Sequence, residues 1–237
     1  ADSLVEEHSN LSVLILSGSP IIGSFDFRPR VDFVRIPGVI KLRDGEYTTL
    51  NLAIDIDETI SLRSSIIKHT ADIFDPDVFI VDKEPMGLRG EVFETLKMLK
   101  QRNKRLVLGL RDVLDASTIL APEWKRKNVL PALRKLYDEI WVYGLPQIYE
   151  PLADLPLPSN VMSKIVYTGY LRSGTAISGR RSGGRIAGSA SELSLPLSRY
   201  LRQRVFIVRA SVTLPKKLVL RTELSISTST VKKTYFE

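Results

Sequence analysis

A loop of opposite charges, residues 83–90, follows an apolar run and is the strongest candidate for a functional site. The run, residues 78–82, is typical of a buried strand, and the loop contains Lys83, Glu84 and Arg89. Open α/β sheets bind ligands at loops beyond the carboxyl ends of their strands. Lys83 or Arg89 could neutralise an anionic group, and Glu84 could hydrogen-bond sugar hydroxyls. Alternatively, these side chains form surface ion pairs, which contribute little to stability.

Further candidate residues follow the next two apolar runs. Arg111 and Asp112 come after the run 105–110, and Tyr143 ends the run 139–143. Asp112 could orient Arg111 toward a cleft, or it could cap a helix. Tyr143 could place its ring in a sugar site, although tyrosine is also common at strand ends without a function. Parallel strands end at one edge of a sheet, so we expect these residues and the charged loop along the same edge.

Three glycines stand in loops at this predicted edge. Gly87 and Gly90 belong to the charged loop, and Gly18 follows the apolar run 11–17. Glycine allows either a tight turn or the close approach of a ligand to the backbone, and the turn is favoured for Gly87 and Gly90. The Gly18 loop has neither Gly-x-Gly-x-x-Gly nor a Walker lysine, which argues against a dinucleotide enzyme.

Metal and cofactor chemistry has little support in the sequence. There is no cysteine, and neither His8 nor His69 has a second histidine or a carboxylate at the spacing of a metal site. Asp55 and Asp57 could hold a divalent cation, but they precede a helical pattern, which favours helix capping. The sequence therefore predicts no bound metal and no cofactor, and it identifies no catalytic residue.

Strand-like and helical patterns alternate over the first 172 residues, which predicts an α/β fold with a Rossmann-like parallel sheet and flanking helices. Strands are expected at residues 11–17, 31–36, 78–82, 105–110, 139–143 and 164–168. Helices are expected at residues 3–9, from 57 or 59 to 74, at 91–102 and at 122–137.

The composition changes near residue 172, which divides the chain into two predicted regions. The formal net charge is +7, and residues 173–237 hold 12 Lys or Arg against 3 Asp or Glu, together with 11 serines. We predict a domain at 1–172 and a basic tail of low order at 173–237. A changed reading frame would explain the shift. Alternatively, the tail contacts an anionic membrane or nucleic acid, but its few aromatic residues are not interleaved with its basic ones, which disfavours nucleic acid.

The same features bear on cellular location. No run reaches the 18 or more apolar residues of a membrane span, and the first ten residues lack the pattern of a signal peptide. The absence of cysteine is compatible with a reducing compartment. The sequence therefore predicts a cytoplasmic protein.

Several ordered motifs resemble a known family. They are Ser17-Gly-Ser-Pro20, Pro37-Gly-Val-Ile-Lys-Leu42, Val81-Asp-Lys-Glu-Pro-Met-Gly-Leu-Arg-Gly-Glu91, Leu108-Gly-Leu-Arg-Asp112, Trp141-Val-Tyr-Gly144 and Tyr167-Thr-Gly-Tyr-Leu-Arg172. They look like the amino-terminal half of predicted bacterial glycosyltransferases, distant relatives of the lipid-linked N-acetylglucosaminyltransferase of peptidoglycan synthesis. The resemblance covers residues 1–172 and implies the GT-B class, in which two Rossmann-like domains face each other across a cleft.

In that class the amino-terminal domain receives the acceptor, and the carboxy-terminal domain binds a nucleotide-sugar, commonly a UDP-sugar. The resemblance thus implies that the parent enzyme transfers a sugar to a hydroxyl acceptor. It places on the acceptor side of the cleft Lys83, Glu84, Arg89, Arg111, Asp112 and Tyr143.

The sequence departs from the family pattern at both ends. The family's first strand with its glycine-rich loop, and its donor domain, have no counterpart in the sequence, so we expect residues 1–172 to be an incomplete acceptor-side domain and the chain an inactive fragment. The alternative is a noncatalytic binding module. A missing first strand would leave an open slot or edge in the sheet, which predicts marginal stability or aggregation.

Overall fold

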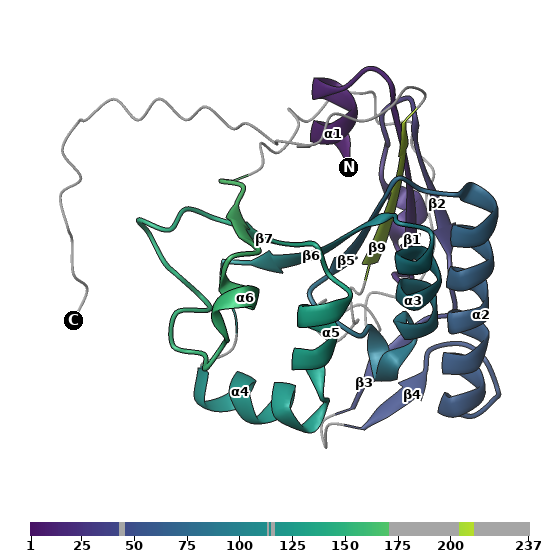
Figure 1. The fold of residues 1–237 in the computed structure, drawn as a ribbon. Coiled ribbons are helices and arrows are strands. Elements are labelled where there is room, and N and C mark those ends of the chain that lie inside the picture. The colour runs from purple at the N-terminus through teal and green to yellow at the C-terminus, as the bar shows by residue number, and fades with distance from the viewer. Residues whose placement is uncertain (43–45, 113, 115–116, 171–203, 211–237) are drawn as a thin grey trace, which may run out of the picture.

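A computed structural model describes residues 1–42, 46–112, 114, 117–170 and 204–210. Its centre is a seven-stranded sheet of order β2-β1-β9-β5-β6-β7-β8 with helices packed against it (Figure 1), which confirms the α/β, Rossmann-like prediction. The strands of this sheet are β1 (Leu11–Ser17), β2 (Val31–Arg35), β5 (Val78–Asp82), β6 (Arg105–Arg111), β7 (Glu139–Tyr143), β8 (Ile165–Tyr167) and β9 (Arg204–Ala210). The helices are α1 (Asp2–Glu7), η1 (Ile22–Ser24), α2 (Ile56–Phe74), η2 (Leu88–Gly90), α3 (Phe93–Gln101), α4 (Ser117–Arg126), α5 (Val129–Lys135) and α6 (Ser159–Met162).

Four neighbouring pairs in the sheet are parallel: β1 with β2, β5 with β6, β6 with β7, and β7 with β8. These six strands lie where the apolar runs predicted strands, with ends that differ by one or two residues. Strands such as β5 are apolar along their whole length because both faces of a parallel sheet are covered. The carboxyl ends of β5, β6 and β7 meet at one edge, as expected.

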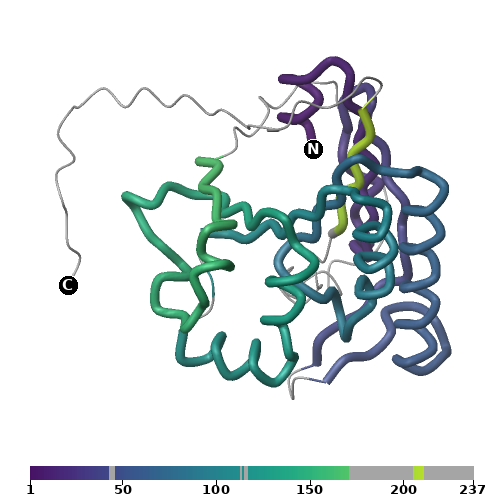
Figure 2. Tube along the Cα trace, in the orientation of Figure 1, coloured from purple at the N-terminus to yellow at the C-terminus, as the bar shows by residue number. Residues whose placement is uncertain are grey.

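The two faces of the sheet are covered differently. Phe79 and Val81 of β5 face a large apolar cluster with residues of α2, α3, α4 and α5. Val78 and Ile80 face a second, smaller cluster to which α1 and η1 contribute. In the Cα trace, α2, α3 and α5 lie near one another, whereas α1 lies apart from them at the top of the view (Figure 2).

Two helix predictions need correction. The segment 122–137 is not one helix but two, α4 and α5, because Asn128 between them adopts a left-handed backbone (φ 50°) that breaks the helical path. Pro122 lies inside α4 rather than at its start. Helix α2 begins after Asp55, whose carboxylate accepts a hydrogen bond of 2.8 Å from the Glu58 amide. Asp55 is therefore a helix cap.

A small hairpin was not predicted. β3 (Val39–Lys41) and β4 (Tyr47–Thr49) pair antiparallel outside the main sheet. Leu50 donates its amide to the Gly38 carbonyl at 2.9 Å, and this bond ties the hairpin end to the loop that follows β2. The hairpin therefore sits at the same edge as the charged loop.

The most consequential difference lies beyond residue 172. Arg204–Ala210 forms β9, which is inserted between β1 and β5 and runs antiparallel to both. Val205, Ile207 and Val208 are almost completely buried. The sheet therefore includes part of the predicted basic tail, and β9 closes the slot that was expected in the sheet. The other residues of the predicted tail, apart from those in β9, lie outside the described residues.

None of the described helices is long and apolar enough to traverse a membrane.

Candidate functional site

The charged loop after β5 has an unusual backbone. Lys83 (φ 72°), Arg89 (φ 50°), Gly87 (φ 70°) and Gly90 (φ 89°) all lie in the left-handed region. For lysine and arginine this conformation costs free energy, and such residues concentrate at ligand sites and tight turns. The Lys83 amide donates to the Gly109 carbonyl at 2.7 Å, so the loop starts from a fixed position on the sheet.

The charged side chains of this loop form ion pairs with other elements. Glu84 lies 2.9 Å from the Lys127 ammonium, and Arg89 lies 3.0 Å from the Asp57 carboxylate. The Arg89 pair is largely exposed, so it contributes little to stability. Glu84 and Arg89 thus form ion pairs, as the alternative interpretation of the loop allows, and their partners are Lys127 and Asp57.

A buried ion pair anchors the end of the loop. The Arg63 guanidinium donates from Nε and Nη2 to the Glu91 carboxylate, at 2.5 and 2.7 Å, and from Nη1 to the Pro37 carbonyl at 2.5 Å. Both side chains are almost fully buried, at 3% and 0% exposure. A Cβ on Gly18 would lie only 2.7 Å from Nη1, so only glycine allows this approach. Arg63 therefore links the loops after β2 and β5 by hydrogen bonds and packs against Gly18 in the loop after β1, and it was not among the predicted site residues.

A second junction forms at the ends of β6, β7 and β8. Asp112 accepts a hydrogen bond of 2.7 Å from the Tyr170 hydroxyl, and this bond raises the pKa of Tyr170. A Cβ on Gly144 would lie 2.5 Å from the Asp112 Cβ, and Gly169 donates to the Gly144 carbonyl at 3.1 Å. Asp112 is thus placed to order the loops beside the pocket described next.

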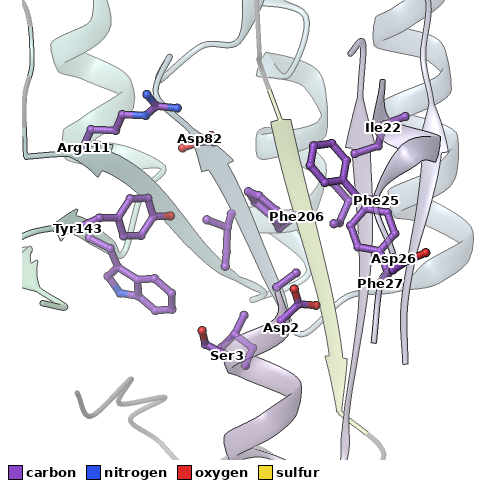
Figure 3. Close-up of a pocket in the computed structure, with 15 residues that line it drawn as sticks. Asp2, Ser3, Ile22, Phe25, Asp26, Phe27, Asp82, Arg111, Tyr143 and Phe206 are labelled. Atoms are coloured by element: carbon purple, nitrogen blue, oxygen red, sulfur yellow. The ribbon is translucent and has the colours of Figure 1, made fainter. Parts of the chain in front are cut away.

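A pocket of about 400 Å³ opens on the sheet face that carries α1. Its wall includes residues 1–4, which form the beginning of the chain and the first turn of α1, and residues 25–27, which follow η1. The remaining wall consists mainly of side chains from β1, β5, β6, β7 and β9. Asp82 and Arg111 lie at one end and Asp2 at the other, with the Tyr143 and Phe206 rings between them (Figure 3).

Arg111 and Tyr143 are the two predicted site residues that line this pocket. The Tyr143 side chain extends over Gly109 of the neighbouring strand β6. A Cβ atom added to Gly109 would lie 2.1 Å from the Tyr143 hydroxyl oxygen. Burial raises the pKa of Tyr143 well above its usual value, and the nearby charge of Asp82 adds to the effect. The pocket lining does not include the other predicted side chains Lys83, Glu84, Arg89 and Asp112, nor the loop glycines Gly18, Gly87 and Gly90.

The lining combines aromatic rings with carboxylates. Phe25 and Phe27 lie with their ring centroids 6.3 Å apart, and Phe27 and Phe33 are 5.6 Å apart. The Oδ1 atom of Asp2 is buried and accepts no hydrogen bond from any described residue. A ligand hydroxyl in the pocket could satisfy this oxygen, because a buried acceptor without a donor is costly.

Comparisons with known proteins found no matching family model, no similar curated protein and no similar solved structure. Within the described part of the chain, no group of three or more His, Cys, Asp or Glu side chains could hold a metal ion.

The buried tyrosine predicts a loss of stability at high pH. Because the pKa of Tyr143 is higher in the folded state, its contribution is fully present below the unfolded value of about 10 and is lost as pH rises above that value. We expect the free energy of unfolding to fall above about pH 10. For the Tyr143→Phe variant, this free energy should fall less steeply with pH. Urea titrations of both proteins at a series of alkaline pH values measure the difference, and equal slopes would contradict the assignment.

A substitution at Gly109 is expected to displace the Tyr143 ring without changing any side chain that lines the pocket. Gly109→Ala would place a methyl group on the Tyr143 hydroxyl, so the ring must move, at a cost of about 1–3 kcal/mol. We expect Tyr143→Phe to suppress part of this cost, because the phenyl ring has no hydroxyl at that point. Thermal unfolding of both single variants and the double variant checks the coupling, and purely additive effects would rule it out.

Proposed function

We propose that this α/β domain binds the hydroxyl acceptor of a glycosyltransferase of the GT-B class. In the parent enzyme a sugar passes from a nucleotide-sugar, of which a UDP-sugar fits the resemblance best, to that hydroxyl. The observation that carries the proposal is the pocket at Asp82, Arg111 and Tyr143. These three residues stand at the carboxyl ends of β5, β6 and β7, the end at which open α/β folds bind ligands, and the rest of the pocket extends along one face of the sheet. The lining offers rings and hydrogen-bonding groups of the kind that sugars use.

The polar residues in the lining favour a neutral acceptor over a diphosphate. The lining side chains include three carboxylates, Asp2, Asp26 and Asp82, and one guanidinium, Arg111. A leaving diphosphate needs positive groups or helix amino termini that stabilise its charge. Excess carboxylates instead repel phosphates and accept hydrogen bonds from hydroxyl groups. The pocket therefore fits the acceptor side of transfer, and the donor belongs to a different surface.

Glycosyl transfer to a hydroxyl also needs a group that accepts the proton of the attacking oxygen. Asp82 stands at the end of β5 inside the pocket, and its charge reaches the Tyr143 hydroxyl. We assign Asp82 as this proton acceptor within the proposed function. Asp82 was not among the site residues predicted from the sequence.

Binding of neutral aryl glycosides tests the proposal. Trp141 lines the pocket, so its fluorescence reports occupancy once the other tryptophan is removed by Trp124→Phe. With phenyl β-D-glucopyranoside as the first probe, we expect weak but saturable quenching, reduced at least tenfold by Tyr143→Ala. Lys97→Ala serves as the control because Lys97 lies on α3, against the opposite face of the sheet. Quenching that is unaffected by Tyr143→Ala would refute a pocket site.

Transfer activity separates binding from catalysis. We expect no UDP release when the chain of 237 residues is incubated with UDP-glucose or UDP-N-acetylglucosamine and an acceptor glycoside. The physical reason is that the described residues provide an acidic pocket and no second α/β unit for the donor. A coupled assay measures the release of UDP. Sustained turnover would contradict the proposal that this domain binds the acceptor and does not bind the donor.

A further inference from the structure

Two walls of the pocket come from outside the sheet. Residues 1–4, which include the start of α1, form one wall, and residues 25–27, between η1 and β2, form another (Figure 3). A helix of six residues has little stability of its own, so the place of α1 depends on its contacts with the rest of the domain. The contacts that fix α1 therefore also set the shape of the pocket.

Arg30 holds the carboxyl end of α1 through three hydrogen bonds. Its Nη1 atom donates to the carbonyl oxygens of His8 and Leu11, both at 2.9 Å, and its Nη2 atom donates to the Val5 carbonyl at 2.6 Å. The last carbonyls of a helix have no partner within the helix, and a cation beside them also interacts favourably with the helix dipole. α1 has no basic residue in its own last turn, so this positive charge comes from another part of the chain.

The same residue is connected to the other wall and to the sheet. Arg30 follows residues 25–27 closely in the chain, and its carbonyl accepts a hydrogen bond of 2.8 Å from the Val13 amide of β1. Its backbone lies in the left-handed region (φ 73°), which costs free energy for residues other than glycine. Arginine thus stands where glycine would be less strained, and its hydrogen bonds to the end of α1 are a gain that glycine cannot provide.

We propose that Arg30 is a positioning residue of the pocket, which holds Asp2 and Ser3 in the lining by fixing α1 against β1 and residues 25–27. The Oδ1 atom of Asp2 is buried without a donor among the described residues, and this placement keeps it where a ligand hydroxyl could reach it. Arg30 is not itself in the lining, so it acts through α1. The identity of the ligand rests on the proposed function, whereas the placement of the wall does not.

Lys164 offers a matched control, because it makes the same kind of contact with a helix that does not line the pocket. Its Nζ atom donates to the carbonyl oxygens of Leu133, Arg134 and Tyr137, at 2.9, 2.8 and 2.7 Å, at the end of α5. α5 packs against the opposite face of the sheet. Arg30→Ala and Lys164→Ala each remove three hydrogen bonds from a helix end, so a purely structural role predicts similar consequences for both.

Quenching of tryptophan fluorescence by acrylamide measures the wall without a ligand. Trp141 lines the pocket, is only 2% exposed, and belongs to the same apolar cluster as the buried residues of α1. In a Trp124→Phe background it is the one remaining tryptophan. Displacement of α1 should expose its indole, so we expect Arg30→Ala to increase the quenching and Lys164→Ala to leave it unchanged, both measured where circular dichroism shows a native protein.

Two other substitutions of Arg30 separate the placement of the wall from stability. Arg30→Gly relieves the left-handed backbone, so it should unfold at a higher urea concentration than Arg30→Ala, yet leave Trp141 equally accessible to acrylamide. Arg30→Lys retains an ammonium that can donate to helix carbonyls, as Lys164 does, so it should restore part of the protection.

Binding of phenyl β-D-glucopyranoside adds the readout that depends on the proposed function. Its affinity should fall about fivefold in Arg30→Ala and Arg30→Gly, the effect of one lost hydrogen bond to the ligand. In Lys164→Ala the affinity should not change, even where the loss of stability is the same.

Different outcomes would contradict the role of Arg30 and the proposed function. If the Arg30 variants are quenched no more than Lys164→Ala, Arg30 does not position the wall, whatever the result with the glycoside. If quenching increases only in the Arg30 variants while neither they nor the wild type bind the glycoside, the positioning role stands and the acceptor assignment is wrong. Should Arg30→Ala fail to fold, Arg30→Gly gives the same comparison with Lys164→Ala.

Discussion

Replacing Ile207 with aspartate is expected to unfold the protein. Ile207 is completely buried in the middle of β9, where it pairs with Leu14 on one side and Phe79 on the other. The substitution removes a large apolar side chain and buries a carboxylate that has no cation opposite it. We expect a loss of more than about 4 kcal/mol, which is most of the stability of an ordinary domain.

Circular dichroism and urea titration would measure this loss. The matched control is Arg209→Asp, which introduces the same side chain on the same strand at an exposed position. It loses only a long hydrogen bond to the Phe74 carbonyl, so we expect a change within about 0.5 kcal/mol. If Ile207→Asp unfolded at the same urea concentration as this control, β9 would not occupy the centre of the sheet.

The behaviour of β9 shows what the sequence could and could not predict. Its core, Val205–Val208, is a continuous apolar run of the same type as residues 78–81, from which β5 was predicted correctly. No strand was predicted there, because the serines and arginines around the run dominate the composition of residues 173–237. No local pattern indicates that a strand so late in the chain fills a slot between β1 and β5.

Two of the predicted site residues line the pocket, and the others do not. Strand ends follow from the apolar runs, and Arg111 and Tyr143, which stand at such ends, are these two residues. Loop side chains depend on backbone angles, and the left-handed conformations of Lys83 and Arg89 are not encoded in a visible pattern. The pocket wall from residues 25–27 and β9 depends on tertiary packing, which periodicity does not report.

Arg63 did leave a signal in the sequence. It lies on the same helical stripe of α2 as Ile67 and Ala71, which are completely buried. A charged residue on the apolar face of a helix needs a buried partner of opposite charge. Glu91, just after the charged loop, is that partner. The two together indicate a structural anchor beneath a loop that was selected for its surface charges.

Arg63→Met is expected to destabilise the protein by about 3–5 kcal/mol, because Glu91 would remain buried without its cation. The Pro37 carbonyl would also lose its donor. The loop at residues 83–90 would lose its attachment to the neighbouring edge, so its amides should exchange with solvent faster than those of β6. Urea titration and hydrogen exchange measure the two effects separately. Lys97→Met, which breaks an exposed pair with Glu94, should cost less than about 0.5 kcal/mol.

A second substitution distinguishes the charge from the shape of this pair. If the cost arises from an uncompensated buried carboxylate, Arg63→Met/Glu91→Gln should be more stable than Arg63→Met alone, because glutamine keeps the size of Glu91 without its charge. The hydrogen bond from Arg63 to Pro37 is absent in both variants, so it cannot produce the difference. A double variant no more stable than Arg63→Met would show that packing around the guanidinium, and not its charge, holds the loops after β2 and β5 together.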